Sequence, residues 1–213
     1  MLANPVINTN KREERPRERV LSDAELRLIW QALSDNESVS DHYSTIIRLL
    51  LLTGQRVNEI AGLRWSEINF ERGVISLPGE RTKNGKPHEV PMAATVHSLL
   101  AAQASNGREF VFGEGAGPFS GLSRRKAALD QDIARLRHGR PLSAWVHHDL
   151  RRSTATGMAE IGIQPHIIEA VLNHVSGHKG GIAGIYNRAQ YGPEKAQALA
   201  RWDQHISELV GGA

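Results

Sequence analysis

One short stretch of strand-like sequence inside an otherwise helical pattern constrains the fold of this chain more than any other feature. Residues 73–78 and 88–91 are brief runs that contain β-branched residues, and Asn84-Gly85, a dipeptide common in hairpin turns, lies between them. Elsewhere the apolar residues recur every three or four positions, as in amphipathic helices. We therefore predict an α+β fold, mostly α-helical, with a small antiparallel three-stranded sheet near the middle of the chain.

The expected helices begin at a capping box, in which the Ser22 hydroxyl and the Glu25 carboxylate each satisfy a free backbone amide of the other residue. A second helix, rich in Ile and Leu, covers residues 41–53 and ends at Gly54. We expect further helices at 95–104, 120–138, 149–161, 165–173 and 193–210, and a short strand-like segment at 110–112.

The composition places the chain among globular proteins that bury a core. It has 213 residues, of which 40% are apolar, and we assign residues 21–213 to one domain and the highly charged residues 1–20 to a linker or tail. The absence of cysteine excludes disulfides, thiolate zinc sites and cysteine nucleophiles. The longest apolar run, residues 49–52, is far below the roughly 20 residues of a membrane helix, and the first ten residues lack a signal-peptide core. We therefore expect a cytoplasmic protein.

Positive charge is concentrated in one window of the chain. The net charge of the whole chain is only +3, but residues 120–152 hold eight Lys or Arg against three Asp, which is a local charge of +5. A basic face of this kind can follow a phosphate backbone, although an ordinary solvent-exposed helix explains it equally well when taken alone.

Two segments in the first half of the chain offer cations suited to phosphate chemistry. Arg56 follows Gly54 at a tight junction between two helices, and Glu59, three residues later, can hold the guanidinium in place. Lys83 lies on the predicted hairpin, where its ammonium could reach a leaving-group oxygen. Each residue alone has an ordinary structural explanation as a surface charge.

Three segments in the second half complete the set. His148 and Arg151 share one face near a helix N-terminus, where free amides favour an anion, and the adjacent His147 leaves the register open. His174 closes an apolar helix, and Tyr186 follows twelve residues later in Ile-Tyr-Asn-Arg. Taken singly, these residues resemble common helix caps and rim residues.

Taken together, the order Arg56, Lys83, His148-x-x-Arg151, His174 and Tyr186 resembles the catalytic domain of the tyrosine recombinases, also called the phage integrase family. The resemblance covers residues 21–210 and is greatest to integrases of prophages and genomic islands. The chain departs from the family at Asn173, where the usual residue is Gly, and in the loop after it, where His178 rivals His174. Full-length members also carry an N-terminal core-binding domain that clasps DNA, which is absent from this sequence.

The resemblance implies a chemistry without metal, ATP or any other cofactor. Tyr186, rather than Tyr191, would attack the scissile phosphate to form a 3′-phosphotyrosyl link. His148 would take its proton, and Lys83 would protonate the leaving 5′-oxygen. The phosphate would be stabilised by Arg56, Arg151 and His174. Glu59 and Asp149 would position the catalytic side chains.

Two other functions compete with this interpretation. One is a metal-dependent nuclease that uses the histidines of the second half (His147, His148, His174 and His178), but no acidic cluster and no His-Glu-x-x-His motif accompanies them. The other is a catalytically idle, DNA-binding remnant of an integrase. Covalent attachment to DNA distinguishes the enzyme from this remnant, and activity in the presence of EDTA excludes the nuclease.

The expected partner is double-stranded DNA with an attachment-type site, and no membrane is involved. The last helix carries an apolar stripe (Leu199, Trp202, Ile206, Leu209 and Val210), which must be covered either by the same chain or by a neighbouring subunit. We expect a monomer in free solution that self-associates on DNA, and we expect the fold to survive removal of residues 194–213.

Overall fold

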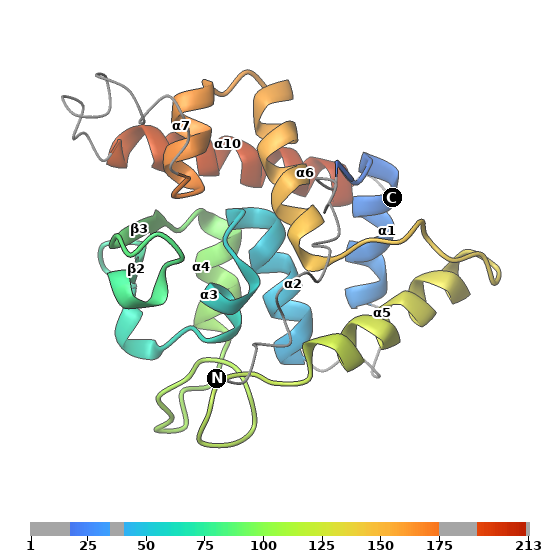
Figure 1. Cartoon of the computed structure of the whole chain (residues 1–213), viewed down its shortest axis with the longest axis horizontal. Coiled ribbons are helices and arrows are strands. Elements are labelled where there is room, and N and C mark those ends of the chain that lie inside the picture. Colours follow the sequence, from blue (N-terminus) through green and yellow to red (C-terminus); the bar gives the residue numbers. More distant parts are fainter. Residues whose placement is uncertain (1–17, 35–40, 175–190, 212–213) are drawn as a thin grey trace, which may run out of the picture.

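The computed structural model describes residues 18–34, 41–174 and 191–211. It is mostly helical with a small antiparallel three-stranded sheet, which confirms the predicted fold class (Figure 1). The strands are β1 (Ile68–Asn69), β2 (Val74–Leu77) and β3 (His88–Pro91), and the short 3₁₀ helices are η1 (Trp65–Glu67) and η2 (Gly79–Arg81). The α-helices are α1 (Asp23–Ser34), α2 (Asp41–Thr53), α3 (Val57–Ala61), α4 (Ala94–Ala101), α5 (Leu122–Leu136), α6 (His147–Glu160), α7 (Pro165–Val171) and α10 (Gly192–Gly211).

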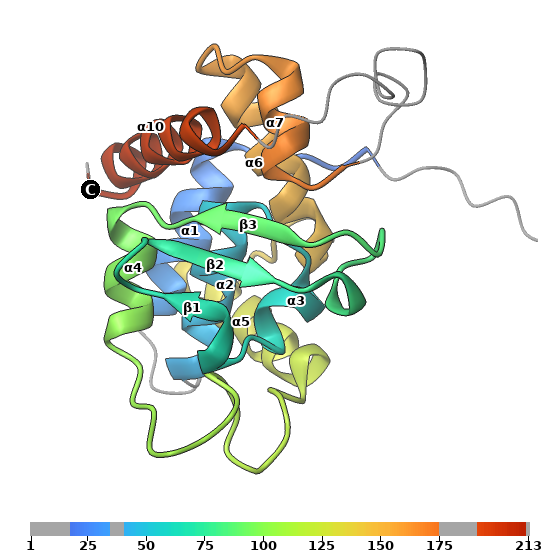
Figure 2. The same ribbon diagram turned by 90° about the vertical axis from the view of Figure 1, so that its left-hand side faces the viewer.

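The sheet covers one side of the helical body. Its strands follow the order β1-β2-β3, and Ile75 of β2 pairs with Ile68 on one side and Val90 on the other. Alternate residues of β2 and β3 are fully buried while their neighbours are half-buried, as expected for a sheet with one face on the core. Figure 2 shows the sheet in front of α2, with α4 at one end and α10 running past β3.

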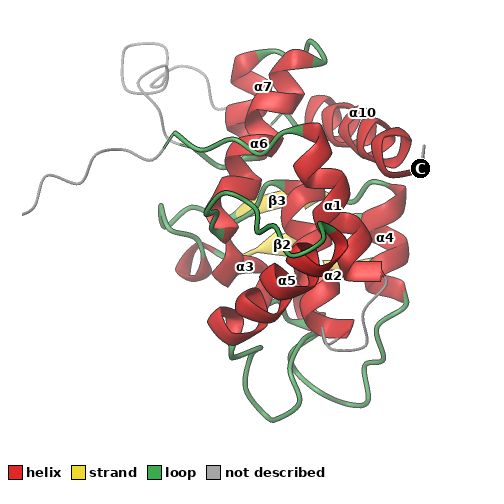
Figure 3. Cartoon of the chain, turned by 90° about the vertical axis from the view of Figure 1, so that its right-hand side faces the viewer, coloured by secondary structure: helices red, strands yellow, loops and turns green. Residues whose placement is uncertain are grey.

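Helix α2 is the centre of the domain. Every residue from Tyr43 to Leu52 except Arg48 is buried, and α1, α3, α4, α6 and α10 all contact the helix. Figure 3 shows the helical side of the molecule, on which α1 and α5 lie together. The sequence-predicted helix at 41–53 is therefore confirmed, and its many Ile and Leu residues reflect burial on nearly every side.

The C-terminal end of α2 joins three helices through a single carbonyl. Leu51 lies in the last turn, where helix carbonyls lack partners within the helix. Its oxygen accepts a hydrogen bond from Thr154 Oγ1 of α6 at 2.8 Å and another from Trp202 Nε1 of α10 at 2.9 Å. The helix then ends at Gly54, whose φ of 66° lies in the left-handed region. This end of α2 therefore fixes both α6 and α10.

Helix α10 packs on its own chain. Leu199, Trp202 and Ile206 are at most 1% exposed, and α10 contacts α1, α2, α4, α6, α7 and β3. The Trp202 ring lies so close to α6 that a Cβ at Gly157 would approach it to 2.5 Å. The apolar stripe is therefore covered in cis. This burial argues against the expectation that the fold survives removal of residues 194–213, because that removal would expose the core.

Strands β2 and β3 form the predicted antiparallel hairpin. They are joined by ten residues, 78–87, which include η2. The Gly85 amide donates to the Thr82 carbonyl at 3.2 Å, and Gly85 has a φ of 70°, so a turn lies at the predicted Asn84-Gly85 signal. The Asn84 side chain also bonds Asn173 in another part of the chain, a contact that the local turn signal does not indicate.

Two smaller differences concern element boundaries. The strand-like segment at 110–112 forms only an isolated bridge between Phe110 and Arg64. Helix α6 begins at His147 and not at residue 149, because the Asp149 carboxylate accepts a hydrogen bond from the Val146 amide at 2.9 Å and so caps the helix two residues earlier.

His88 is buried and His147 is half-buried, and both have a low affinity for a proton. His88 Nε2 donates to the Val171 carbonyl at 3.0 Å, and burial, followed by the charge of Lys195, lowers the pKa of His88 to about 4. His147 is hydrogen-bonded to the Tyr43 hydroxyl at 2.9 Å, and burial, followed by the charge of Lys126, lowers the pKa of His147 to about 4. Both side chains are neutral in the folded protein at pH 7.

We predict that Gly54→Ala is more destabilising than Gly73→Ala. Both positions have a positive φ, but a Cβ at Gly54 would lie 2.6 Å from Leu172, whereas a Cβ at Gly73 meets nothing within 4 Å. Backbone strain alone costs about 1 kcal/mol at Gly73, and the clash adds about 1–3 kcal/mol at Gly54. Chemical denaturation of the two variants measures this difference, and equal losses would contradict the tight packing at Gly54.

We predict that stability decreases as the pH falls from about 6.5 to about 4. In this range the unfolded chain binds protons at His88 and His147 that the folded protein does not bind, so acid favours unfolding by about 3 kcal/mol per histidine. His88→Gln keeps a donor for the Val171 carbonyl and removes one titrating group. Unfolding free energies measured at pH 7 and pH 4.5 should therefore differ less in this variant than in the unchanged protein.

Candidate active site

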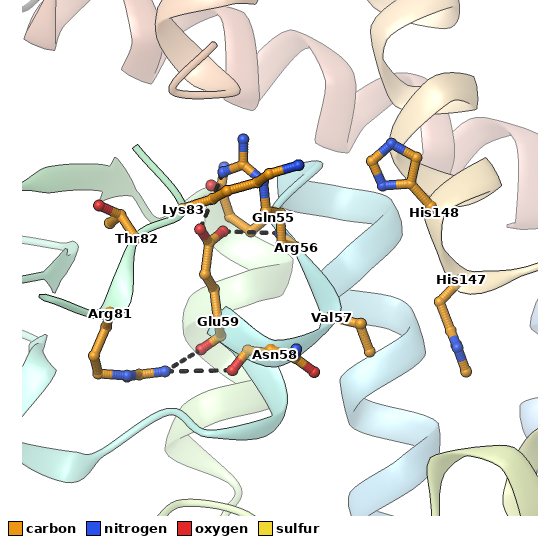
Figure 4. A pocket seen from close by; sticks show the side chains of 10 residues that line it. All are labelled: Gln55, Arg56, Val57, Asn58, Glu59, Arg81, Thr82, Lys83, His147 and His148. Atoms are coloured by element: carbon orange, nitrogen blue, oxygen red, sulfur yellow. Dashed lines mark hydrogen bonds and ion pairs between the residues drawn. The ribbon is translucent and has the colours of Figure 1, made fainter. Parts of the chain in front are cut away.

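A cavity of about 390 Å³ lies where α3, the β2–β3 connection and the start of α6 meet. Figure 4 shows that it brings Arg56, Lys83 and His148 to one place, although they are far apart in the sequence. Gln55 and Glu59 also contribute to its wall. Three of the six candidate residues from the sequence therefore share one hollow, and two of the three carry a fixed positive charge.

Arg56 is held by the predicted partner. It is the N-cap residue of α3 with an extended backbone (φ −77°, ψ 146°). Glu59, only 3% exposed, accepts a hydrogen bond from the Arg56 amide at 2.9 Å and from its guanidinium at 3.1 Å. The same carboxylate thus fixes both the start of the helix and the direction of the Arg56 side chain. The other N–H groups of the guanidinium could bind an anion.

Arg151 is almost fully buried and is bonded to Gly54, two residues before Arg56 of the cavity wall. One terminal nitrogen of its guanidinium donates to the Gly54 carbonyl at 2.7 Å, and the other donates to the Leu172 carbonyl at 2.6 Å. These bonds occupy two of its five N–H groups. Burial, and then the nearby charge of Arg56, lower the pKa of Arg151 to about 10, so it remains charged at pH 7. Two guanidinium groups placed this close together favour an anion between them.

His147 and His148 both line the cavity, but only His148 is exposed. Figure 4 shows His147 and His148 pointing in different directions, and His147 is engaged with Tyr43. Partial desolvation, and then the charges of Arg152 and Arg151, lower the pKa of His148 below its ordinary value. A neutral imidazole at pH 7 is the form that accepts a proton.

The Asp149 carboxylate organises the start of α6. Its side chain is fully buried, and its second oxygen accepts a hydrogen bond from Arg152 at 2.8 Å. Together with its bond to the Val146 amide, this contact fixes the start of the helix that carries His148 and Arg151. The role of Asp149 in positioning these residues stays a prediction.

Lys83 and His174 lie on two segments that contact each other. Lys83 is exposed within the β2–β3 connection, and Figure 4 shows its side chain extended over Arg56. His174 is exposed immediately after α7, and Asn173 before it adopts a φ of 48°. This left-handed backbone explains why glycine suits the position in the family, and Asn is among the residues that tolerate it best.

The predicted nucleophile, Tyr186, and the rival histidine, His178, lie outside the described residues. The other two tyrosines differ in their surroundings. Tyr43 is fully buried in α2, and burial raises its pKa, so it cannot supply a phenolate. Tyr191 is half-buried and makes an edge-to-face contact with His166.

Sequence reasoning missed residues that fix the walls of the cavity. Gln55 is 1% exposed, and its amide donates to the Thr53 and Val171 carbonyls, both at 2.9 Å. Arg81 forms an ion pair with Glu67 and donates to the Glu59 carbonyl at 2.8 Å, which ties the β2–β3 connection to α3. The only sign of this role in the sequence is that Gln55 is next to Arg56. Gln55 bonds Val171 and Arg81 bonds Glu59, and because these partners are distant in the sequence, no local pattern indicates the contacts.

Within the described part of the chain, no group of three or more His, Asp or Glu side chains is placed to hold a metal ion. Among the same residues, no helix is both long enough and apolar enough to cross a membrane.

Comparisons with known proteins all indicate the same family. A model described as the phage integrase family matches residues 19–192. The Escherichia coli K12 prophage integrases IntZ and IntA are 31% and 28% identical to the chain, and the alignments cover 98% and 99% of it. They cover 51% of IntZ and 50% of IntA, so the chain spans about half the length of these relatives.

Solved structures show the same fold at low sequence identity. The Tn1549 transposon integrase in complex with a circular intermediate DNA has a TM-score of 0.62 at 18% identity, covering 76% of this chain and 60% of that one. A lambda integrase tetramer bound to a Holliday junction has a TM-score of 0.56 at 23% identity, covering 83% and 52%. Because the family model spans most of the chain and includes all six positions from Arg56 to Tyr186, the chain belongs to the phage integrase family.

Proposed function

We propose that this chain is the catalytic part of a site-specific DNA recombinase that cuts and rejoins DNA through a covalent 3′-phosphotyrosyl intermediate. The observation that supports this most is the pairing of Arg56 and Arg151. The charge of Arg56 acts on the buried Arg151, each guanidinium group is fixed by partners within the fold, and Arg56 lines the cavity together with Lys83 and His148. Such an arrangement suits one phosphate group of a DNA strand.

In the proposed reaction the Tyr186 oxygen attacks the scissile phosphorus while the bond from phosphorus to the 5′-oxygen breaks. The phenol proton passes to His148, and Lys83 gives a proton to the departing 5′-oxygen. The tyrosyl phosphodiester retains the energy of the broken bond, so attack by another strand's 5′-hydroxyl restores the DNA backbone and releases Tyr186. No cofactor takes part in this balance.

The surrounding cations stabilise the crowded phosphate during the exchange. Preorganised donors aimed at developing charge contribute on the order of 3–4 kcal/mol each. Arg151 is well suited to this role because its side chain is already desolvated and oriented by two carbonyls, so little reorganisation is needed when a phosphate arrives. We place His174 at a non-bridging oxygen of the same phosphate.

The proposed partner is double-stranded DNA, bound in part by the basic window 120–152. Three of its eight cations form ion pairs with its three aspartates (Lys126 with Asp130, Arg135 with Asp132 and Arg152 with Asp149). The window therefore keeps a net positive charge beyond these pairs. Solved relatives in complex with DNA support this partner, and we place the activity in the cytoplasm, where bacterial DNA lies.

We further propose that the chain is a monomer in free solution and associates with other copies on DNA. The apolar stripe of α10 is covered in cis by α2, α6 and α7, so it does not demand a partner subunit. Bringing two cleaved strands together for exchange requires more than one active site, and DNA supplies the common scaffold.

We predict that the chain forms a covalent adduct with a nicked duplex that carries its attachment site. Cleavage next to the nick releases a short fragment that begins with the 5′-hydroxyl, and the diffusion of this fragment prevents rejoining. Tyr186→Phe removes the nucleophilic oxygen and should abolish the adduct, whereas Tyr191→Phe should retain it. Denaturing electrophoresis with labelled DNA measures both. An adduct that persists in Tyr186→Phe and disappears in Tyr191→Phe would assign the nucleophile to Tyr191, and an adduct lost on addition of EDTA would favour a metal-dependent nuclease.

We predict that DNA affinity decreases steeply with salt and that the exposed cations of the basic window account for part of the slope. Each phosphate contact contributes about −0.9 to the slope of log affinity against log salt concentration. Replacing Arg124 and Arg140, both exposed, by Gln should therefore reduce the slope by about 2. Arg72→Gln is the control, because Arg72 lies beside the sheet and pairs with Glu89. An equal effect of the control in fluorescence anisotropy would contradict the assignment.

A further inference from the structure

Two asparagine side chains join the segment that carries Lys83 to the segment that carries His174. Asn84 Nδ2 donates to Asn173 Oδ1 at 2.8 Å and to the Asn173 carbonyl at 3.1 Å. Asn173 Nδ2 donates back to Asn84 Oδ1 at 3.3 Å. The pair is half-buried, and each member is the immediate neighbour of a candidate catalytic residue.

Asn173 is well suited to this contact because of its backbone conformation. Its φ of 48° lies in the left-handed region, which glycine and asparagine enter at the least steric cost. A glycine here would allow the same turn after α7 but would leave Asn84 without the side-chain half of the pair. The departure from the family's usual glycine therefore adds two hydrogen bonds at little backbone cost.

Asn84 transmits the contact to Lys83. Asn84 Oδ1 accepts a hydrogen bond from the Lys86 amide at 3.1 Å and lies 3.2 Å from Thr82 Oγ1, so one side chain contacts residues on both sides of Lys83. Thr82 is buried, and the Lys86 carbonyl, 2.8 Å from its hydroxyl, is the nearest acceptor for the single hydroxyl proton. Lys83 itself stays exposed between two anchored neighbours.

We propose that Asn84 and Asn173 are positioning residues that hold the Lys83 ammonium at the leaving 5′-oxygen. They touch neither substrate nor the reacting atoms. Their pair fixes the β2–β3 connection against the end of α7, so the general acid and the His174 segment keep one relative position while the phosphate is attacked. This inference rests on the proposed function, because it assigns the purpose of Lys83 within that reaction.

The test compares two leaving groups in the nicked-duplex reaction. In one substrate the scissile phosphate carries the ordinary 5′-oxygen, and in the other the bridging atom is sulfur. A thiol has a pKa near 8.5, so a thiolate leaves without receiving a proton and does not need Lys83. Asn173→Gly and Asn84→Ala should slow single-turnover cleavage of the oxygen substrate about tenfold or more, while cleavage of the sulfur substrate stays within about twofold of the unchanged chain.

Asn106→Gly is the matched control. Asn106 also has a positive φ, 46°, and lies in the loop between α4 and α5, so the control makes the same chemical change away from the site. It should cleave both substrates at the rate of the unchanged chain. Because Asn84 and Asn173 act as a pair, the double variant should be no slower than the slower single variant.

The possible outcomes separate this inference from the proposed function. If the unchanged chain forms no adduct with either substrate, the proposed function fails. If the unchanged chain cleaves both but Asn173→Gly slows them equally, or slows neither, the pair does not act through Lys83. Trypsin cleavage after Lys83 in the native protein gives a readout independent of activity. It should become several-fold faster in Asn173→Gly than in Asn106→Gly, and equal rates would overturn the anchoring of the connection.

Discussion

The site depends on the hydrogen bonds that the buried guanidinium of Arg151 makes to two backbone carbonyls. The guanidinium joins the turn after α2, through the Gly54 carbonyl, to the end of α7, through the Leu172 carbonyl. Arg56 follows the first of these segments and His174 follows the second, so one side chain from α6 ties together the segments that precede two further candidate residues. A buried charge with no partner is costly, and the two carbonyls offset part of that cost in the absence of DNA.

Contacts among α2, α6 and α10 hold the segments around Arg151 in place. The last turn of α2 leaves the Leu51 carbonyl to α6 and α10, and Trp202 packs against α6 where a glycine, Gly157, makes room for its ring. Helix α10 is therefore a structural part of this domain and not an appendage. Because the same α6 carries His148 and Arg151, the position of α10 affects the site through the helix on which it packs.

The sequence predicted the elements well because their signals are local. Helical periodicity found the central helix that ends at Gly54, and the spacing of Arg56 and Glu59 found their ion pair. The contacts that the sequence did not predict have the opposite property. The Asn84-Gly85 signal indicated the turn but not the bond from Asn84 to Asn173, 89 residues away, and nothing near Arg151 in the sequence indicates that backbone carbonyls hold it. Contacts between distant segments are set by packing, which a local pattern does not contain.

We propose that one phosphate of DNA sits between Arg56 and Arg151 while Arg151 keeps its place in the fold. A crystal structure of the Tyr186→Phe variant bound to uncleaved attachment-site DNA measures this directly. We expect the scissile phosphate to contact both guanidinium groups and to face His148 and Lys83, with the bonds from Arg151 to Gly54 and Leu172 intact. A scissile phosphate bound without Arg151, or an Arg151 that has left both carbonyls to reach it, would contradict the account.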